Sequence, residues 1–190
     1  IDPTSTYAQA AAMAMGRAMD DVIITAASAT AFTGETGATS TAAQTAIAAG
    51  GAGLTIAKLR TAKQTFDLAS VDPSIPRHIV VGPEQITNLL STTEVTSSDF
   101  NTVKALVQGE IDSFLGFKFT VSNRLAKSGN DRTCIAFAQD GITLAIGKDV
   151  SARIDERADK SYATQVYYCQ SIGATRMEEA KVLGIVCQEA

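Results

Sequence analysis

The hydrophobic pattern at the start of the chain is typical of one long helix. Asp2-Pro3 is a helix-start pair, because an Asp side chain caps free backbone N–H groups and proline in the first turn loses no hydrogen bond. Good helix formers dominate from Tyr7 to Ala27. Larger apolar side chains recur there at helical spacing: Met15, Met19, Val22 or Ile23, and Ala26. The pattern predicts a helix from Asp2 to Ser28, about 40 Å long.

A loop and a second helix are expected next. Small and polar residues from Thr30 to Gly53 indicate a long surface loop, with a short helix at Ser40 to Ala49. Thr55 is a suitable cap for a helix that Asp72-Pro73 would stop. One face of this helix carries Ile56, Leu59, Ala62, Phe66 and Ala69, and the remaining positions carry Lys58, Arg60, Lys63 and Gln64.

Short elements fill the middle of the chain. His78 to Val81 predicts a strand, and Gly82-Pro83 turns the chain into a third helix. The polar stretch Ser91 to Asn101 predicts an irregular, mobile segment, and Val103 to Val107 predicts a short fourth helix.

From Glu110 onward the pattern changes to the alternation of β-strands. Phe117, Phe119 and Val121 alternate with polar residues, which indicates a half-buried strand. The segment from 142 to 146 fits either a helix or a strand. Other strands are expected at Glu110 to Phe114, Cys134 to Phe137, Val150 to Ile154, Thr164 to Arg176 and Lys181 to Cys187. Helices in the first half and antiparallel strands in the second predict an α+β fold.

Composition narrows the classes of function. The 190 residues suffice for one sizeable core or two small ones. The net charge of −4 lacks the basic footprint of a nucleic-acid-binding protein. No stretch approaches the roughly 20 apolar residues of a membrane span, so no membrane partner is expected. The chain opens at Ile1 rather than Met, which leads us to expect that something upstream is absent.

The residues that could carry chemistry favour structural roles. The cysteines Cys134, Cys169 and Cys187 are odd in number and widely spaced, so we expect reduced core thiols and no zinc site. His78 is the single histidine, and no GxSxG motif accompanies it, which disfavours a catalytic triad. The glycines from 50 to 53 lack the spacing of a phosphate-binding loop. We therefore predict no catalytic, cofactor-binding or metal site.

Acidic pairs are better explained by ion pairing than by catalysis. Asp20 and Asp21 point about 100° apart on a helix, and either could pair with Arg17. Glu178 and Glu179 fall between the last two strands, where a charged hairpin tip is a plainer explanation than a weak cation site.

A cluster of mixed charge lies in the turn expected from 155 to 160 and just before it. Alternating signs suit contacts between identical subunits, where charge sets register, although a solvated turn explains the spacing equally well. The candidate intersubunit residues are Arg153, Asp155, Glu156, Arg157, Asp159 and Lys160.

Taken in order, these elements resemble the major capsid proteins of tailed bacteriophages, with the Hong Kong 97-type fold that encapsulin nanocompartments share. The helix at Tyr7 to Ala27 resembles the family's spine helix, and Gly53 to Ser91 its central run of helix, strand and helix. LGFKFTVSNRL, Leu115 to Leu125, is similar to a recurrent strand of the family and is the most specific passage. Ala136 to Val186 resembles its closing short helix, long hairpin and final strand.

The resemblance implies how the chain is divided. Residues 50–125 would form the A-domain at the capsomer centre, and residues 1–49 and 126–190 would supply the spine helix and strands of the P-domain. The family's N-terminal arm and E-loop would be absent, which puts shell assembly by this chain in question. Some members cross-link an E-loop Lys to a P-domain Asn with the help of a Glu. Gln165 and Ile172 stand near those two positions, so that chemistry is not expected.

The implied function is structural and not enzymatic. The chain would self-assemble into the pentamers and hexamers of an icosahedral virion shell that encloses DNA without sequence-specific binding, assembled in the host cytoplasm. Its other partners would be scaffolding, portal or decoration proteins, and no cofactor is implied. The alternatives are an encapsulin-type shell protein and, from another class, a small α+β ligand-binding domain or enzyme.

Overall fold

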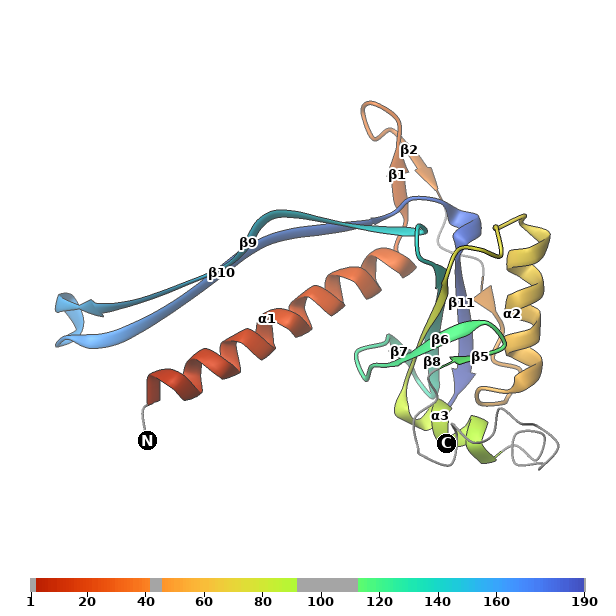
Figure 1. Cartoon of the computed structure of the whole chain (residues 1–190), viewed down its shortest axis with the longest axis horizontal. Coiled ribbons are helices and arrows are strands. Elements are labelled where there is room, and N and C mark those ends of the chain that lie inside the picture. The colour runs from red at the N-terminus through yellow and green to blue at the C-terminus, as the bar shows by residue number, and fades with distance from the viewer. Residues whose placement is uncertain (1–2, 42–45, 92–112, 190) are drawn as a thin grey trace.

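The computed structural model describes residues 3–41, 46–91 and 113–189. These residues form two parts (Figure 1). A compact body contains a seven-stranded sheet and two helices, and a long arm, made of a helix and a two-stranded ribbon, projects from one side of it. This confirms the α+β fold class.

The helix of the arm is α1, Pro3–Ser28, which agrees with the predicted bounds to within one residue. The stripe of Met15, Met19, Val22 and Ile23 is half-buried. Ala27, next to the body, is the one fully buried side chain among residues 6–28 of this helix. The other side chains from residue 6 to residue 28 are exposed or half-buried.

The ribbon of the arm consists of β9, Ile142–Arg157, and β10, Ala163–Arg176, which pair antiparallel from the Ile142–Arg176 end to the Arg157–Ala163 end. The 142–146 segment is therefore strand, and the short helix implied at the start of the closing run is absent there. Residues 155–157 also belong to β9 and not to a turn. The turn itself is η1, Ala158–Lys160, followed by Ser161 and Tyr162 in the left-handed region.

The sheet of the body joins segments that are far apart in the sequence. Its order is β3-β11-β8-β4-β6-β5, with β7 paired to β8. The β3–β11 and β4–β6 pairs are parallel, and the others are antiparallel. The strands are β3, Ala46–Ile47; β4, Arg77–Val81; β5, Ser113–Phe114; β6, Phe117–Val121; β7, Lys127–Ser128; β8, Asp131–Ala138; and β11, Val182–Gln188. Strands from both sides of the expected boundary at 125/126 thus share one sheet.

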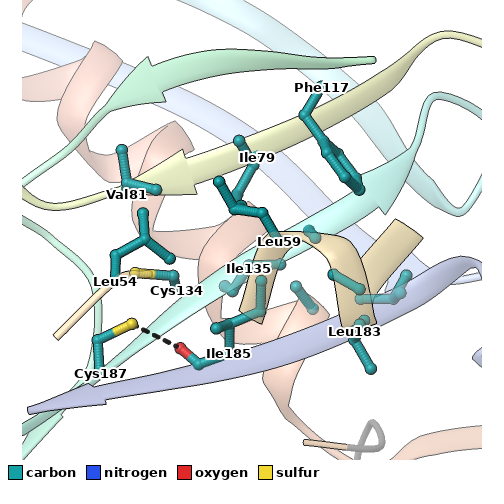
Figure 2. Packing of buried hydrophobic residues seen from close by; sticks show 14 of the residues in the cluster. Leu54, Leu59, Ile79, Val81, Phe117, Cys134, Ile135, Leu183, Ile185 and Cys187 are labelled. Carbon is teal, nitrogen blue, oxygen red and sulfur yellow. Dashed lines mark hydrogen bonds between the residues drawn. The ribbon is translucent and has the colours of Figure 1, made fainter. Parts of the chain in front are cut away.

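Two helices pack on this sheet. They are α2, Ile56–Leu68, capped by the Thr55 side chain, and α3, Pro83–Ser91. The predicted apolar face of α2 is buried at Leu59, Ala62 and Phe66. Figure 2 shows Leu54 and Leu59 meeting side chains of the sheet strands β4, β6, β8 and β11. The helix ends before Asp72-Pro73, because Ser70 already adopts a left-handed conformation.

Lys58, which the pattern placed away from the apolar face, is buried. Its Nζ donates hydrogen bonds to the carbonyl oxygens of Ala52 at 2.7 Å, Gly53 at 2.9 Å and Val186 at 3.0 Å. The ammonium group therefore ties the loop before α2 to β11. A buried charge is tolerated here because all three of its protons have acceptors.

The segment expected as a loop with a short helix contains strands instead. β1, Ala31–Thr33, and β2, Thr39–Thr41, form a hairpin, and β3 follows at Ala46–Ile47. The helix expected at Ser40 to Ala49 is wrong, since Thr residues favour the extended backbone of a hairpin. The segments 92–101 and 103–107, and residues 110–112 of the next expected strand, lie outside the described residues. None of the described helices has the length and apolar character that crossing a membrane requires.

Candidate functional site

The charged candidate residues lie at the far end of the arm. Arg153, Asp155, Glu156 and Arg157 are in β9, and Asp159 and Lys160 are in η1. All six are exposed. The Arg157 Nε donates to the Asp159 Oδ1 at 2.9 Å, and this hydrogen bond lowers the pKa of Asp159 below its ordinary value. No ion pair within the described part of the chain joins Arg153, Asp155, Glu156 or Lys160.

Strand geometry divides this cluster between two faces of the ribbon. Arg153 lies opposite Tyr167 and Asp155 opposite Gln165, on the outer face that points away from α1. Ile154 pairs with Val166 on the inner face, and Glu156 follows it there. The structure therefore brings Arg153, Asp155 and Arg157 together, and it separates them from Glu156.

The inner face of the ribbon lies against α1 nearer the body. There the Gln170 Nε2 donates to the Met15 carbonyl at 3.4 Å, and an Arg176 Nη1 donates to the Ala27 carbonyl at 3.3 Å. Beyond the reach of α1 this face is open, and Ile154 is 51% exposed.

A groove of about 510 Å³ marks the outer face of the ribbon. Its lining is Lys148, Ser151, Arg153, Asp155, Gln165, Tyr167 and Cys169. Cys169 is half-buried and is therefore not the core thiol that the sequence predicted, because it lies in the arm, before β10 reaches the body. Cys134 and Cys187 are buried, as predicted, and the thiols of all three cysteines are free.

Large apolar side chains are exposed along the whole arm. They are Tyr7 and Met13 on α1, Ile146, Val150 and Ile154 on β9, Tyr162 in the turn, and Tyr167 on β10. Apolar surface exposed on this scale is a common mark of protein–protein contact sites. The sequence did not predict this exposed surface. Apolar alternation indicates that one face of a strand is buried, but it does not show whether the same chain or a partner covers that face.

A comparison with models of protein families identifies the family of this chain. A family model described as phage capsid protein matches residues 1–189. The chain belongs to the phage capsid protein family. This confirms the resemblance drawn from its motifs.

Solved capsid structures share the fold of this capsid protein. It is similar to a chain from Mycobacterium phage Che8, with a TM-score of 0.70 and 19% identity over 97% of this chain and 63% of that one. For Helicobacter pylori bacteriophage KHP30 the TM-score is 0.71, with 11% identity over 99% and 70% of the two chains. For cyanophage Pam1 it is 0.69, with 14% identity over 100% and 70%.

These likenesses establish the Hong Kong 97-type fold, and the chain spans roughly two thirds of each of those capsid chains. Among curated proteins no sequence matches this capsid protein.

The other residues that the sequence analysis weighed for catalysis or ion pairing make contacts typical of structural residues. The sequence predicted that Asp20 or Asp21 could pair with Arg17. Asp21 instead forms an ion pair with Arg124, because the fold brings the loop after β6 to α1. His78 stacks on Phe137 with ring centroids 5.6 Å apart, and burial, followed by the charge of Lys118, lowers its pKa.

Glu178 pairs with Lys181 at 2.8 Å, at the junction between arm and body rather than at a hairpin tip. Among the described residues no group of three or more His, Cys, Asp or Glu side chains is placed to hold a metal ion. Gln165 and Ile172, near the cross-linking positions of some family members, lie on opposite faces of β10.

Proposed function

We propose that this capsid protein is the subunit of an icosahedral virion shell, in which it assembles into pentamers and hexamers. The observation that carries the proposal is the uncovered arm. Its 26-residue helix buries a single side chain among residues 6–28, and its ribbon exposes apolar side chains on both faces. An arm of this shape has little core of its own, so neighbouring subunits would supply the missing cover.

The two parts of the molecule suit the two roles that the family resemblance implies. The body would be the A-domain at the capsomer centre, and the arm would be the P-domain, braced by α1 as its spine. Because β8 pairs with β4, and β11 pairs with β8, in one sheet, the proposed A-domain includes both strands as well as residues 50–125. The P-domain would then be α1, the segment after it, and β9 with β10.

The mixed charges at the end of the arm would set the register between subunits. Arg153 and Asp155 lie on one face and make no ion pair within the described chain, so both remain available to a neighbouring copy. Exposed apolar residues such as Ile154 and Tyr162 would supply most of the affinity.

The partners that we propose are those of a virion shell. The net charge of −4 suits a shell that encloses DNA without sequence-specific contacts. Assembly in the host cytoplasm, with scaffolding, portal or decoration proteins, completes the proposal, and it requires no enzymatic activity. The family match favours this function over an encapsulin shell or a small enzyme.

Electron microscopy and light scattering of the purified protein test the proposal. We expect capsomer rings or shells for the wild type and smaller particles for Ile154→Asp, which puts a charge into the exposed apolar surface. Arg153→Glu should weaken assembly, and the double variant with Asp155→Arg should restore part of it. Lys118→Glu, exposed on the body, is the charge-matched control. A protein that stays monomeric at high concentration and binds a metabolite would contradict the shell function.

A further inference from the structure

The groove on the outer face of the ribbon holds a thiol in contact with two potential hydrogen-bond donors. The Lys148 Nζ lies 3.1 Å from the Cys169 Sγ, and the Ser151 Oγ lies 2.9 Å from it. Cys169 is half-buried, so the sulfur is both held and reachable from the groove. The other two thiols, Cys134 and Cys187, are fully buried in the body.

An irregularity in β9 brings the lysine to the thiol. Cys169 pairs with Ser151, but Ser171 pairs with Lys148, so two residues of β9, Asp149 and Val150, stand where one residue would ordinarily stand. Without this β-bulge, strict alternation would place Asp149 on the face of Cys169 and Lys148 on the opposite face. The bulge thus replaces a negative charge beside the sulfur with a positive one.

The charges that face the sulfur favour its thiolate form. Lys148, Arg153 and Asp155 of β9 line the groove, with Asp155 the farthest of the three from the thiol along the ribbon, and β10 contributes the uncharged Gln165 and Tyr167. α1 packs on the other face and lines no part of the groove. The hydrogen bond with Ser151, followed by that with Lys148, lowers the pKa of Cys169 below its ordinary value. By contrast, the hydrogen bond with Cys187 and burial raise the pKa of Cys134 well above it.

We propose that Cys169 is a nucleophilic thiol and the modification site of this protein, with peroxides and soft carbon electrophiles as its reagents and with Lys148 and Ser151 as positioning residues. With hydrogen peroxide, the thiolate sulfur attacks one oxygen and the O–O bond breaks. The sulfur is oxidised to a sulfenic acid. The other oxygen leaves as hydroxide, takes a proton from the Lys148 ammonium and becomes water. This inference does not depend on shell assembly.

Alkylation kinetics of the folded chain test the proposal. The probe is iodoacetamide: the sulfur attacks its methylene carbon, the C–I bond breaks and iodide leaves. Peptide mass spectrometry then reports the rate at each cysteine across a pH series. At neutral pH we expect Cys169 to react several-fold faster in the folded chain than in the chain unfolded by guanidinium, with a rate midpoint below that of an ordinary thiol. Equal rates in the two states would overturn the proposal.

Two variants separate activation from simple exposure. Lys148→Met should raise the midpoint of the pH profile and slow alkylation several-fold at neutral pH, and Ser151→Ala should act in the same direction. Asp149→Asn, the neighbouring charge on the far side of the bulge, is the control and should leave the profile unchanged. Circular dichroism establishes that each variant is folded. A Lys148→Met profile that superimposes on that of the wild type would also overturn the proposal. Treatment with hydrogen peroxide should add one oxygen atom to Cys169 and none to the buried thiols.

Discussion

Arg124, which follows β6 in the body, forms an ion pair with Asp21 of α1 through both its Nε and an Nη group. The two residues are 103 positions apart in the sequence. Their contact is a direct polar link between the body and the helix of the arm. Because the pair joins the loop after β6 to α1, it is a candidate for restraining the arm relative to the body.

Asp21→Asn should loosen the arm without unfolding the body. The pair is exposed on both sides, so the thermal midpoint should change little. Hydrogen exchange of the α1 amides near Asp21 should become faster, and the difference should shrink in high salt, because salt screens exposed charges. Asp20→Asn is the matched control, since Asp20 makes no ion pair to Arg124 in the described chain. Equal exchange rates in the two variants would show that the pair does not restrain the arm.

Glu189 should make the body sensitive to acid. Its side chain is buried, and it accepts hydrogen bonds from Arg132, Lys127 and Gln85, which lower its pKa to about 2. A carboxylate with a lowered pKa contributes stability above its ordinary pKa of 4.5, and that contribution is lost as the pH falls from there toward 2. The full contribution is roughly 3 kcal/mol.

Urea unfolding at neutral and acidic pH measures this contribution. Glu189→Gln should be less stable than the wild type at pH 7, and the two proteins should converge as the pH is lowered toward 2. Glu178→Gln removes an exposed carboxylate and is the control. A gap between wild type and Glu189→Gln that does not depend on pH would contradict the assignment.

Lys58→Met should destabilise the body strongly. The substitution keeps the apolar stem but leaves the carbonyl groups of Ala52, Gly53 and Val186 without their donor. Buried carbonyl groups that lose a charged donor cost about 2–4 kcal/mol in total. Chemical denaturation measures the loss, and Lys63→Met, exposed on the same helix, should have almost no effect. Similar losses for both variants would mean that the hydrogen bonds of Lys58 are not the cause.

Gly141→Ala should strain the junction where β9 leaves the body. A Cβ at this position would lie 2.8 Å from the Lys181 carbonyl oxygen and 3.1 Å from that of Ala138, both of them backbone atoms. Backbone cannot move aside as a side chain can, so the expected loss is about 1–3 kcal/mol. Gly173→Ala, on β10 of the arm, meets nothing within 4 Å and should be neutral in the same thermal unfolding assay. A neutral Gly141→Ala would show that the junction is free to shift.

The sequence alone determined the elements whose signals are local. The bounds of α1 follow from a proline start and a long run of helix formers, and the cap of α2 follows from the Thr55 hydroxyl, which accepts a hydrogen bond from the Lys58 N–H. The alternation in β6 correctly predicted the buried side of Phe117 and Phe119, but Val121 at the end of the strand is 58% exposed. Family membership also followed from the sequence, because the order of such elements is itself a pattern.

Tertiary structure decided everything that depends on partners distant in the sequence. The 39–41 and 46–47 segments are strands because β1 and β11 offer them hydrogen bonds, and no local signal names those partners. Lys58 is buried because the distant Val186 carbonyl joins those of the nearby Ala52 and Gly53 around its ammonium group. Asp21 pairs with Arg124 because the fold brings the body against α1. The bulge that turns Lys148 toward Cys169 exists only in the pairing of two strands. Helix caps and strand alternation depend on neighbouring residues, so the sequence shows them directly. Burial, strand pairing and register depend on contacts between distant segments, which exist only in the folded protein.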